Sequence, residues 1–207
     1  MKHTLARARV EIDLGALQRN GAAVARRSGV RLLPMIKADA YGLGAAAALR
    51  VLDVLEPWGY GVATVREGEE LRELGAARPI VVFTPLLEKE LTRARSARLT
   101  PTLGFAGEIE AWRRAGGGAW HLSIDTGMSR AGIPWRQIGE IRHLIELAPP
   151  EGAFTHFHSA ELDDGTMEEQ ERRRKLRQKQ NAARRAPATS IIRDGCSGRA
   201  LSARRRS

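Results

Sequence analysis

Short apolar runs rich in β-branched residues recur along the chain, and a stretch with the apolar spacing of a helix follows each of them. This alternation is typical of βα units. The runs that we expect to form strands are 30–37, 58–64, 79–83, 99–103, 119–125 and 152–158. Because they are too continuously apolar for a sheet with one wet face, we expect a parallel sheet covered by helices, either doubly wound or closed as a barrel.

The intervening segments have helical spacing. Apolar residues share one helical face in two of them: Leu49, Leu52 and Leu55, and Trp135, Ile138, Ile141 and Leu144. Asp13 is placed to cap a further helix near the start of the chain, and 7–13 before it alternates like a strand. Pro34 lacks the N–H that a strand ladder needs, so a bulge or an unpaired position is expected within 30–37.

The composition excludes several classes of protein. The only cysteine, Cys196, cannot build a disulfide framework or a multi-cysteine zinc site. Arg7 and Arg9 lie where a signal peptide would need its apolar stretch, and no run of about 18 apolar residues occurs. We therefore expect a cytoplasmic chain with no membrane partner, and 43% apolar residues suffice for one sizeable core.

The net charge of +10 is concentrated at one end of the chain. Residues 172–207 hold 13 Lys plus Arg against one acid, whereas 1–171 hold 21 bases and 23 acids. Apolar spacing also stops near 171, so we expect one domain over 1–171 and a disordered basic tail over 172–207. A nucleic-acid-binding tail is the alternative, but the tail has no aromatic residues for base stacking, and we expect no specific nucleic-acid partner.

The segment IKADAYGLG (36–44) places Lys37 at the end of an expected strand and Tyr41 four residues later. The carboxyl ends of parallel strands carry the chemistry in βα folds, and a partly desolvated lysine can act as an imine-forming nucleophile. The structural alternative is that Lys37 is simply the first solvated residue after a strand. Position alone favours this structural alternative.

IKADAYGLG is similar to the pyridoxal-phosphate segment of alanine racemases. Two further segments match this family in the same order: IDTGMSRAG (124–132) resembles its DTGMGRLG segment, and GAFTHFHSAE (152–161) contains its THF run. The early segment VEIDLGALQRN (10–20) also has the family's opening pattern. The resemblance covers about 7–171.

The resemblance implies a role for four residues. Lys37 would hold pyridoxal 5'-phosphate as an imine and act as one of two catalytic bases, and Tyr41 would contact the phosphate. Arg130 would hydrogen-bond the cofactor's phenolic oxygen and help to hold the substrate carboxylate, for which a planar guanidinium is well suited. His156 would pack on the cofactor ring, although His158 points the same way in a strand. Without the resemblance, a solvated loop arginine is an equally good interpretation of Arg130. No metal is expected.

Four positions depart from the family pattern. Leu43 replaces a histidine, and Ser129 and Ala131 replace a glycine and a leucine. Ser123 stands where many members have a lysine that braces the arginine corresponding to Arg130. Leu43 lies at a supporting position, and Ser123 bears on how Arg130 is oriented.

The resemblance implies a fold and an activity. The fold is the (β/α)8 TIM barrel of fold-type III pyridoxal-phosphate enzymes, here incomplete with about six of eight strands. The activity is the interconversion of L-alanine and D-alanine, which supplies D-alanine for peptidoglycan, by an isomerase that forms a homodimer. An alternative is a non-catalytic pyridoxal-phosphate-binding barrel protein.

The family's second base is a tyrosine of a C-terminal domain from the partner subunit, whereas the tyrosines here, Tyr41 and Tyr60, both come too early. The loops after strands seven and eight, which usually build a barrel's phosphate site, also have no counterpart. We therefore expect the chain to be inactive alone. Our hypothesis is that it is truncated or frameshifted after about residue 171, so that the tail from Arg172 is out of frame.

Overall fold

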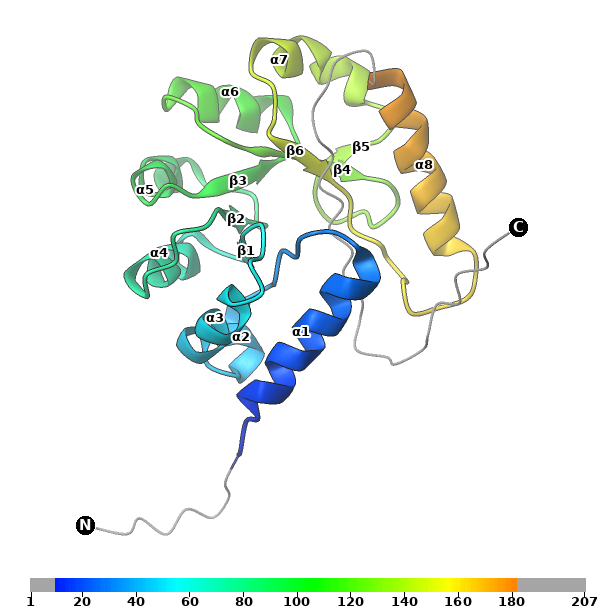
Figure 1. The fold of residues 1–207 in the computed structure, drawn as a ribbon. Coiled ribbons are helices and arrows are strands. Elements are labelled where there is room, and N and C mark those ends of the chain that lie inside the picture. The colour runs from blue at the N-terminus through cyan, green and yellow to red at the C-terminus, as the bar shows by residue number, and fades with distance from the viewer. Residues whose placement is uncertain (1–9, 182–207) are drawn as a thin grey trace, which may run out of the picture. The chain divides into compact units, whose positions relative to one another are not determined.

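The computed structural model describes residues 10–181, with side chains described as far as Lys175 (Figure 1). The chain divides into two compact units, Met1–Pro101 and Thr102–Ser207. The division falls inside strand β3 (Thr100–Leu103), so the first half of this strand belongs to one unit and the second half to the other.

The first unit alternates helices with parallel strands. Its elements are α1 (Leu14–Ser28), α2 (Lys37–Gly42), α3 (Ala45–Asp53), β1 (Tyr60–Val62), α4 (Val65–Glu73), β2 (Ile80–Val82), the 3₁₀ helix η1 (Glu88–Glu90) and α5 (Leu91–Ser96). Strand β1 pairs in parallel with β2, and β2 with the start of β3. Every residue of β1 and β2 is buried, which explains why these runs are continuously apolar.

The second unit is built around β4. After β3 come α6 (Ala106–Arg114), β4 (His121–Asp125), β5 (Ile133–Pro134), the 3₁₀ helix η2 (Ile138–Ile141), α7 (Arg142–Leu147), β6 (Gly152–Phe154) and α8 (Thr166–Asn181). Strand β4 pairs in parallel with β3, β5 and β6. Parallel pairing in both units, with helices between the strands, confirms the expected βα organisation.

The expected strands are present in shortened form, with two exceptions. Segment 30–37 forms only one bridge, between Met35 and Gly61, although Gly61 N donates to Pro34 O (2.8 Å) and Ile36 N donates to Gly61 O (2.7 Å). The segment therefore runs beside β1, with the expected unpaired position at Pro34, which has no N–H to donate. The second exception is 7–13, which is not a strand over 10–13 and otherwise lies outside the described residues.

Helix α1 begins as the sequence predicts. Asp13 caps it, because its Oδ1 accepts from Ala16 N (2.9 Å), and that hydrogen bond lowers the pKa of the Asp13 carboxyl. Gly21 lies so close to the end of α3 that an added Cβ would lie 3.1 Å from Leu52 Cδ2 in this helix and 2.7 Å from Leu55 Cδ1 just beyond it. The close approach of α1 and α3, visible in Figure 1, thus depends on a residue without a side chain.

The expected onset of disorder at Arg172 is wrong for 172–181, because α8 continues to Asn181. Glu169 accepts from both Arg172 (2.7 Å) and Arg173 (2.8 Å), and Arg173 Nη1 donates to Thr126 O (2.7 Å). Ion pairs three and four residues apart support a helix that has little apolar face, so a search for an apolar stripe does not find it. The rest of the expected tail, 182–207, lies outside the described residues.

No helix within 10–181 is long and apolar enough to cross a membrane.

Candidate active site

Lys37 is the first residue of α2 and directly follows the segment that runs beside β1. Its side chain is half-buried, and Nζ lies 5.7 Å from the centroid of the Tyr41 ring, within the range of a cation–π contact. Tyr41 itself is 53% exposed. The structure therefore brings together the two predicted site residues of the first unit.

The turn that carries Lys37 and Tyr41 is left-handed. Ala38, Asp39, Ala40 and Tyr41 have φ between 51° and 57° and ψ between 37° and 51°. None of them is glycine, and this conformation costs an L-residue roughly 1–2 kcal/mol. Such backbone persists only where surrounding contacts impose it, and it is concentrated at functional sites.

Hydrogen bonds hold the left-handed turn at both ends. At its start, Ala38 N donates to Glu67 Oε1 (2.8 Å) and Ala40 N donates to Ile36 O (3.0 Å). At its end, Asp39 accepts from Gly44 N through its backbone (3.0 Å) and from Ala45 N through Oδ1 (2.6 Å). Glu67 was not among the predicted site residues, although the spacing of Thr64 and Glu67 in the sequence is that of a helix-capping box.

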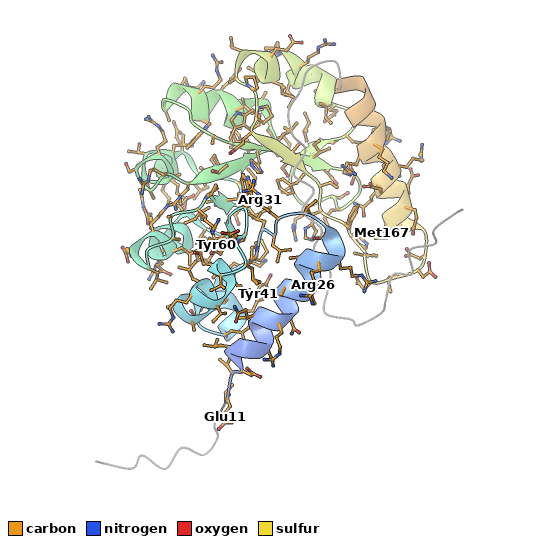
Figure 2. The ribbon with its side chains drawn as sticks, viewed as in Figure 1. Glu11, Arg26, Arg31, Tyr41, Tyr60 and Met167 are labelled. Carbon is orange, nitrogen blue, oxygen red and sulfur yellow. The ribbon has the colours of Figure 1, made fainter. Side chains whose placement is uncertain are left out.

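Tyr60, the second tyrosine of the chain, has a structural role. It is fully buried in β1 and donates to Asp53 Oδ1 (2.6 Å), which also accepts from Arg78 Nε (2.7 Å). Burial and the Asp53 carboxylate raise the pKa of Tyr60, and the two donors lower the pKa of Asp53. Of the two tyrosines labelled in Figure 2, Tyr41 is therefore the one accessible to a ligand.

Arg130 lies in the second unit, in the loop that follows β4. Asp125, the last residue of β4, shapes this loop, because its Oδ1 accepts from Gly127 N (2.9 Å) and Ser129 N (3.0 Å). Ser129 has φ of 55°, a conformation that glycine adopts without strain and that other residues rarely adopt. The Arg130 side chain is exposed.

His156 lies two residues beyond the end of β6 and is half-buried, whereas His158 is exposed. Outside a strand, two residues at this spacing need not point the same way. Just before His156, Thr155 Oγ1 lies 2.7 Å from Thr126 Oγ1, and this buried hydrogen bond joins the segments that follow β4 and β6.

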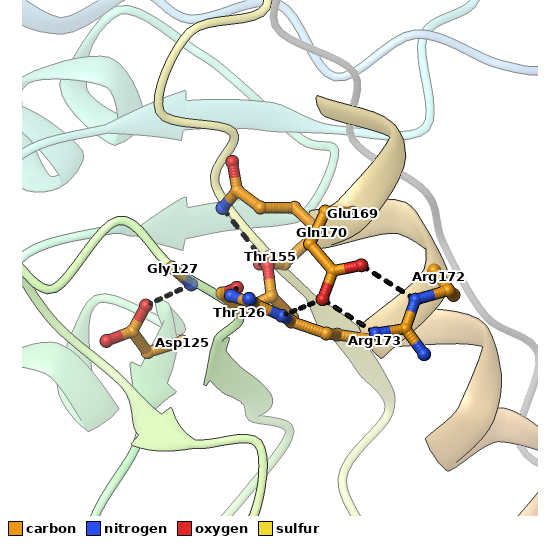
Figure 3. Close-up of polar contacts among 8 residues, drawn as sticks. All are labelled: Asp125, Thr126, Gly127, Thr155, Glu169, Gln170, Arg172 and Arg173. Atoms are coloured by element: carbon orange, nitrogen blue, oxygen red, sulfur yellow. Dashed lines mark hydrogen bonds and ion pairs between the residues drawn. The ribbon is translucent and has the colours of Figure 1, made fainter. Parts of the chain in front are cut away.

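Gln170 of α8 holds the same two segments (Figure 3). Its side chain is 1% exposed, Nε2 donates to Thr126 Oγ1 (3.2 Å) and His156 O (3.1 Å), and Oε1 accepts from His158 N (2.8 Å). Every polar atom of the amide thus has a partner, as a buried amide requires. The sequence offered no signal for this residue, which sits in a polar run.

Each unit therefore presents one pair of groups with complementary chemistry. In the first, an amine suited to attack a carbonyl carbon lies beside a phenol. In the second, a guanidinium suited to bind a carboxylate and an imidazole follow two neighbouring strands. In the part of the chain that the structure describes, no group of acidic, histidine or cysteine side chains is arranged to bind a metal ion.

Comparisons with known proteins agree on one family. Residues 12–202 match the family model described as alanine racemase, N-terminal domain. An alanine racemase of Deinococcus radiodurans is 37% identical over 163 residues, which is 77% of this chain and 46% of that protein. One of Nostoc sp. is 36% identical over 181 residues, which is 81% of this chain and 47% of that protein.

Solved structures give the same result. The alanine racemase of E. faecalis has a TM-score of 0.74 at 27% identity, over 80% of this chain and 48% of that one. That of Clostridium difficile 630 has a TM-score of 0.76 at 23% identity, over 86% of this chain and 52% of that one, a likeness of fold alone. These matches confirm the expected fold class. The chain spans about half the length of the curated relatives it matches.

Proposed function

Because this chain belongs to the alanine racemase N-terminal domain family, we propose that it supplies the cofactor-binding half of an alanine racemase, with pyridoxal 5'-phosphate attached at Lys37. The observation that carries the proposal is the half-buried Lys37 amine, held by a strained left-handed turn beside the Tyr41 phenol. From the family we also propose that the substrate is alanine, that the assembly is a homodimer and that the location is cytoplasmic.

Each unit carries side chains whose chemistry suits this cofactor. Attachment needs a neutral amine that attacks an aldehyde carbon with release of one water molecule, and Lys37 supplies the amine. In the proposal, the Tyr41 hydroxyl donates to the phosphate, and the Arg130 guanidinium donates to the phenolic oxygen of the cofactor and to the substrate carboxylate. The His156 ring packs on the pyridine ring. When bound, the cofactor would withdraw electrons from the substrate Cα and so acidify its proton.

Racemisation needs a base on each face of the substrate Cα. In the proposal, Lys37 accepts and returns the proton on one face through Nζ. Tyr60 cannot serve the other face, because it is buried in β1 and its hydroxyl donates to Asp53. Tyr41 is engaged with the phosphate in this proposal, so neither tyrosine of the chain remains for the second face. We therefore expect the 207-residue chain to bind the cofactor without measurable racemisation on its own.

Borohydride reduction followed by peptide mapping tests the proposal. We expect pyridoxal phosphate to be trapped on Lys37 and this adduct to be lost in Lys37→Ala. The matched control is Lys89→Ala, because Lys89 is exposed and should be modified only at high cofactor concentration. Equal labelling of Lys37 and Lys89 would contradict the proposed site. The chain should also be joined to the C-terminal half of a related alanine racemase and assayed with alanine. Trapping at Lys37 without racemisation by this joined protein would indicate a non-catalytic binding protein.

A further inference from the structure

The Glu67 carboxylate joins two segments of the first unit that are far apart in the sequence. Oε2 accepts from Ala63 N (2.7 Å) and Thr64 N (3.0 Å), in the loop between β1 and α4. Oε1 accepts from Ala38 N (2.8 Å), 29 residues away in sequence. Ala38 directly follows Lys37 and is the first residue of the left-handed turn.

The bond to Ala38 goes beyond what helix capping requires. Glu108 has the same position in α6, and its Oε2 accepts from Gly104 N (2.7 Å) and Phe105 N (3.2 Å), just as Glu67 Oε2 accepts from Ala63 and Thr64. Over the described residues, the hydrogen bonds of the Glu108 side chain remain within the loop that precedes its own helix. The second oxygen of Glu67 is therefore used for the turn that carries Lys37.

Both oxygens of Glu67 must be acceptors for this arrangement to hold. An ionised carboxylate accepts at both oxygens, whereas an amide offers one acceptor and one donor. Glutamine at this position would satisfy either the β1–α4 loop or Ala38 N, and its NH₂ group would face a backbone donor on the other side. Ala38 would then have no acceptor to hold φ at 51°, a conformation that alanine does not favour.

We propose that Glu67 is a positioning residue, which fixes the left-handed turn and thereby sets where the Lys37 amine lies relative to the cofactor aldehyde. This inference rests on the proposed function, in which Lys37 carries pyridoxal phosphate. Glu67 acts through Ala38 and need not touch the cofactor.

Glu67→Gln tests this role in the full chain, with Glu108→Gln as the matched control. The readouts are the rate of pyridoxal phosphate attachment to Lys37, the absorbance maximum of the bound cofactor and the pH dependence of attachment. We expect Glu67→Gln to slow attachment about 10-fold or more and to shift the absorbance spectrum, because one charge-assisted hydrogen bond is lost. Glu108→Gln should change the rate less than about twofold, since both variants weaken a cap of the same kind.

Amide hydrogen exchange in the unmodified protein provides a second measurement that does not depend on how well Glu67→Gln folds. Ala38 is exposed, yet its N–H should exchange slowly because Glu67 accepts it. Rapid exchange at Ala38, or attachment rates and spectra in Glu67→Gln that equal those of Glu108→Gln, would overturn the inference. If the unmodified chain does not attach the cofactor at Lys37, the proposed function fails, whereas exchange at Ala38 still reports on the Glu67 anchor.

Discussion

Replacement of Arg72 should destabilise the first unit more than any change of an exposed charge. Its guanidinium donates to four backbone carbonyls: Nη1 to Ala76 O (2.6 Å) and Arg78 O (2.8 Å), Nε to Ala97 O (3.0 Å) and Nη2 to Arg98 O (2.8 Å). These carbonyls belong to the loops that precede β2 and β3. One side chain of α4 therefore forms hydrogen bonds with both loops. Burial and the charge of Arg98 lower the pKa of Arg72, but an arginine remains charged.

The magnitude follows from the number of bonds. A hydrogen bond contributes about 0.5–1.5 kcal/mol net, so the loss of four in Arg72→Met should lower the free energy of unfolding by about 3 kcal/mol. That is a large part of the roughly 5–15 kcal/mol of a typical domain. Arg72→Lys should lower the free energy of unfolding by about half as much. A lysine ammonium reaches the carbonyls on one side of the site, whereas the planar guanidinium of arginine reaches the carbonyls on both sides.

Urea unfolding followed by circular dichroism measures this effect. With a slope of about 1–3 kcal/mol per molar urea, a loss of about 3 kcal/mol in Arg72→Met should move the midpoint down by about 1–3 M. The control is Arg66→Met, which removes an exposed ion pair between Arg66 and Glu70 and should change the free energy by less than about 0.5 kcal/mol. If the midpoint of Arg72→Met equals that of Arg66→Met, the four carbonyl contacts contribute nothing measurable and the reasoning is refuted.

Two further predictions concern the second unit. Burial lowers the pKa of His121 to about 4, below the ordinary value of 6.5. The unfolded chain therefore protonates this histidine more readily than the folded chain does. The free energy of unfolding should fall as the pH drops from 6.5 towards 4, by at most about 3 kcal/mol. Urea midpoints measured across this window should be less pH-dependent in His121→Leu, and an unchanged dependence would assign the effect to other groups. Gly104→Ala should lower the free energy of unfolding by about 1–3 kcal/mol, because the added Cβ would lie 2.4 Å from Gly132 Cα. The control Gly107→Ala, where no atom lies within 4 Å of the added Cβ, should stabilise α6 by up to about 1 kcal/mol. Equal thermal midpoints for the two alanine variants would contradict the close approach of Gly104 and Gly132.

The strands show where local pattern is sufficient and where it is not. Apolar, β-branched runs located β1, β2, β3, β4 and β6. Strands β1 and β2 are buried at every position and carry no charged residue, as expected of strands covered on both faces. Strands β3 and β4 also bury polar residues: Thr100, Thr102, His121 and Ser123. Segment 30–37 has the same composition but forms a single bridge at Met35, since Pro34 interrupts the ladder. Strand β5 was missed, because it has two residues and exists only through its pairing with β4.

Helix α8 illustrates the opposite error. Its residues lack an apolar stripe, and the sequence therefore predicted a disordered tail from Arg172. The structure shows Gln170 buried against Thr126 and Arg173 bonded to Thr126 O, so two polar side chains dock the helix. Partners 44 and 47 residues away in sequence leave no periodic trace near the helix itself.

The amino-acid sequence by itself determined which chemical groups the chain carries and in what order: the amine of Lys37, the phenol of Tyr41, the guanidinium of Arg130 and the imidazole of His156. Only the tertiary structure decided that a left-handed turn presents the amine, that Glu67 anchors this turn and that Tyr60 is committed to Asp53. The physical reason is that an apolar pattern records which residues avoid water, whereas a hydrogen bond between distant segments exists only once folding has brought its donor and acceptor together.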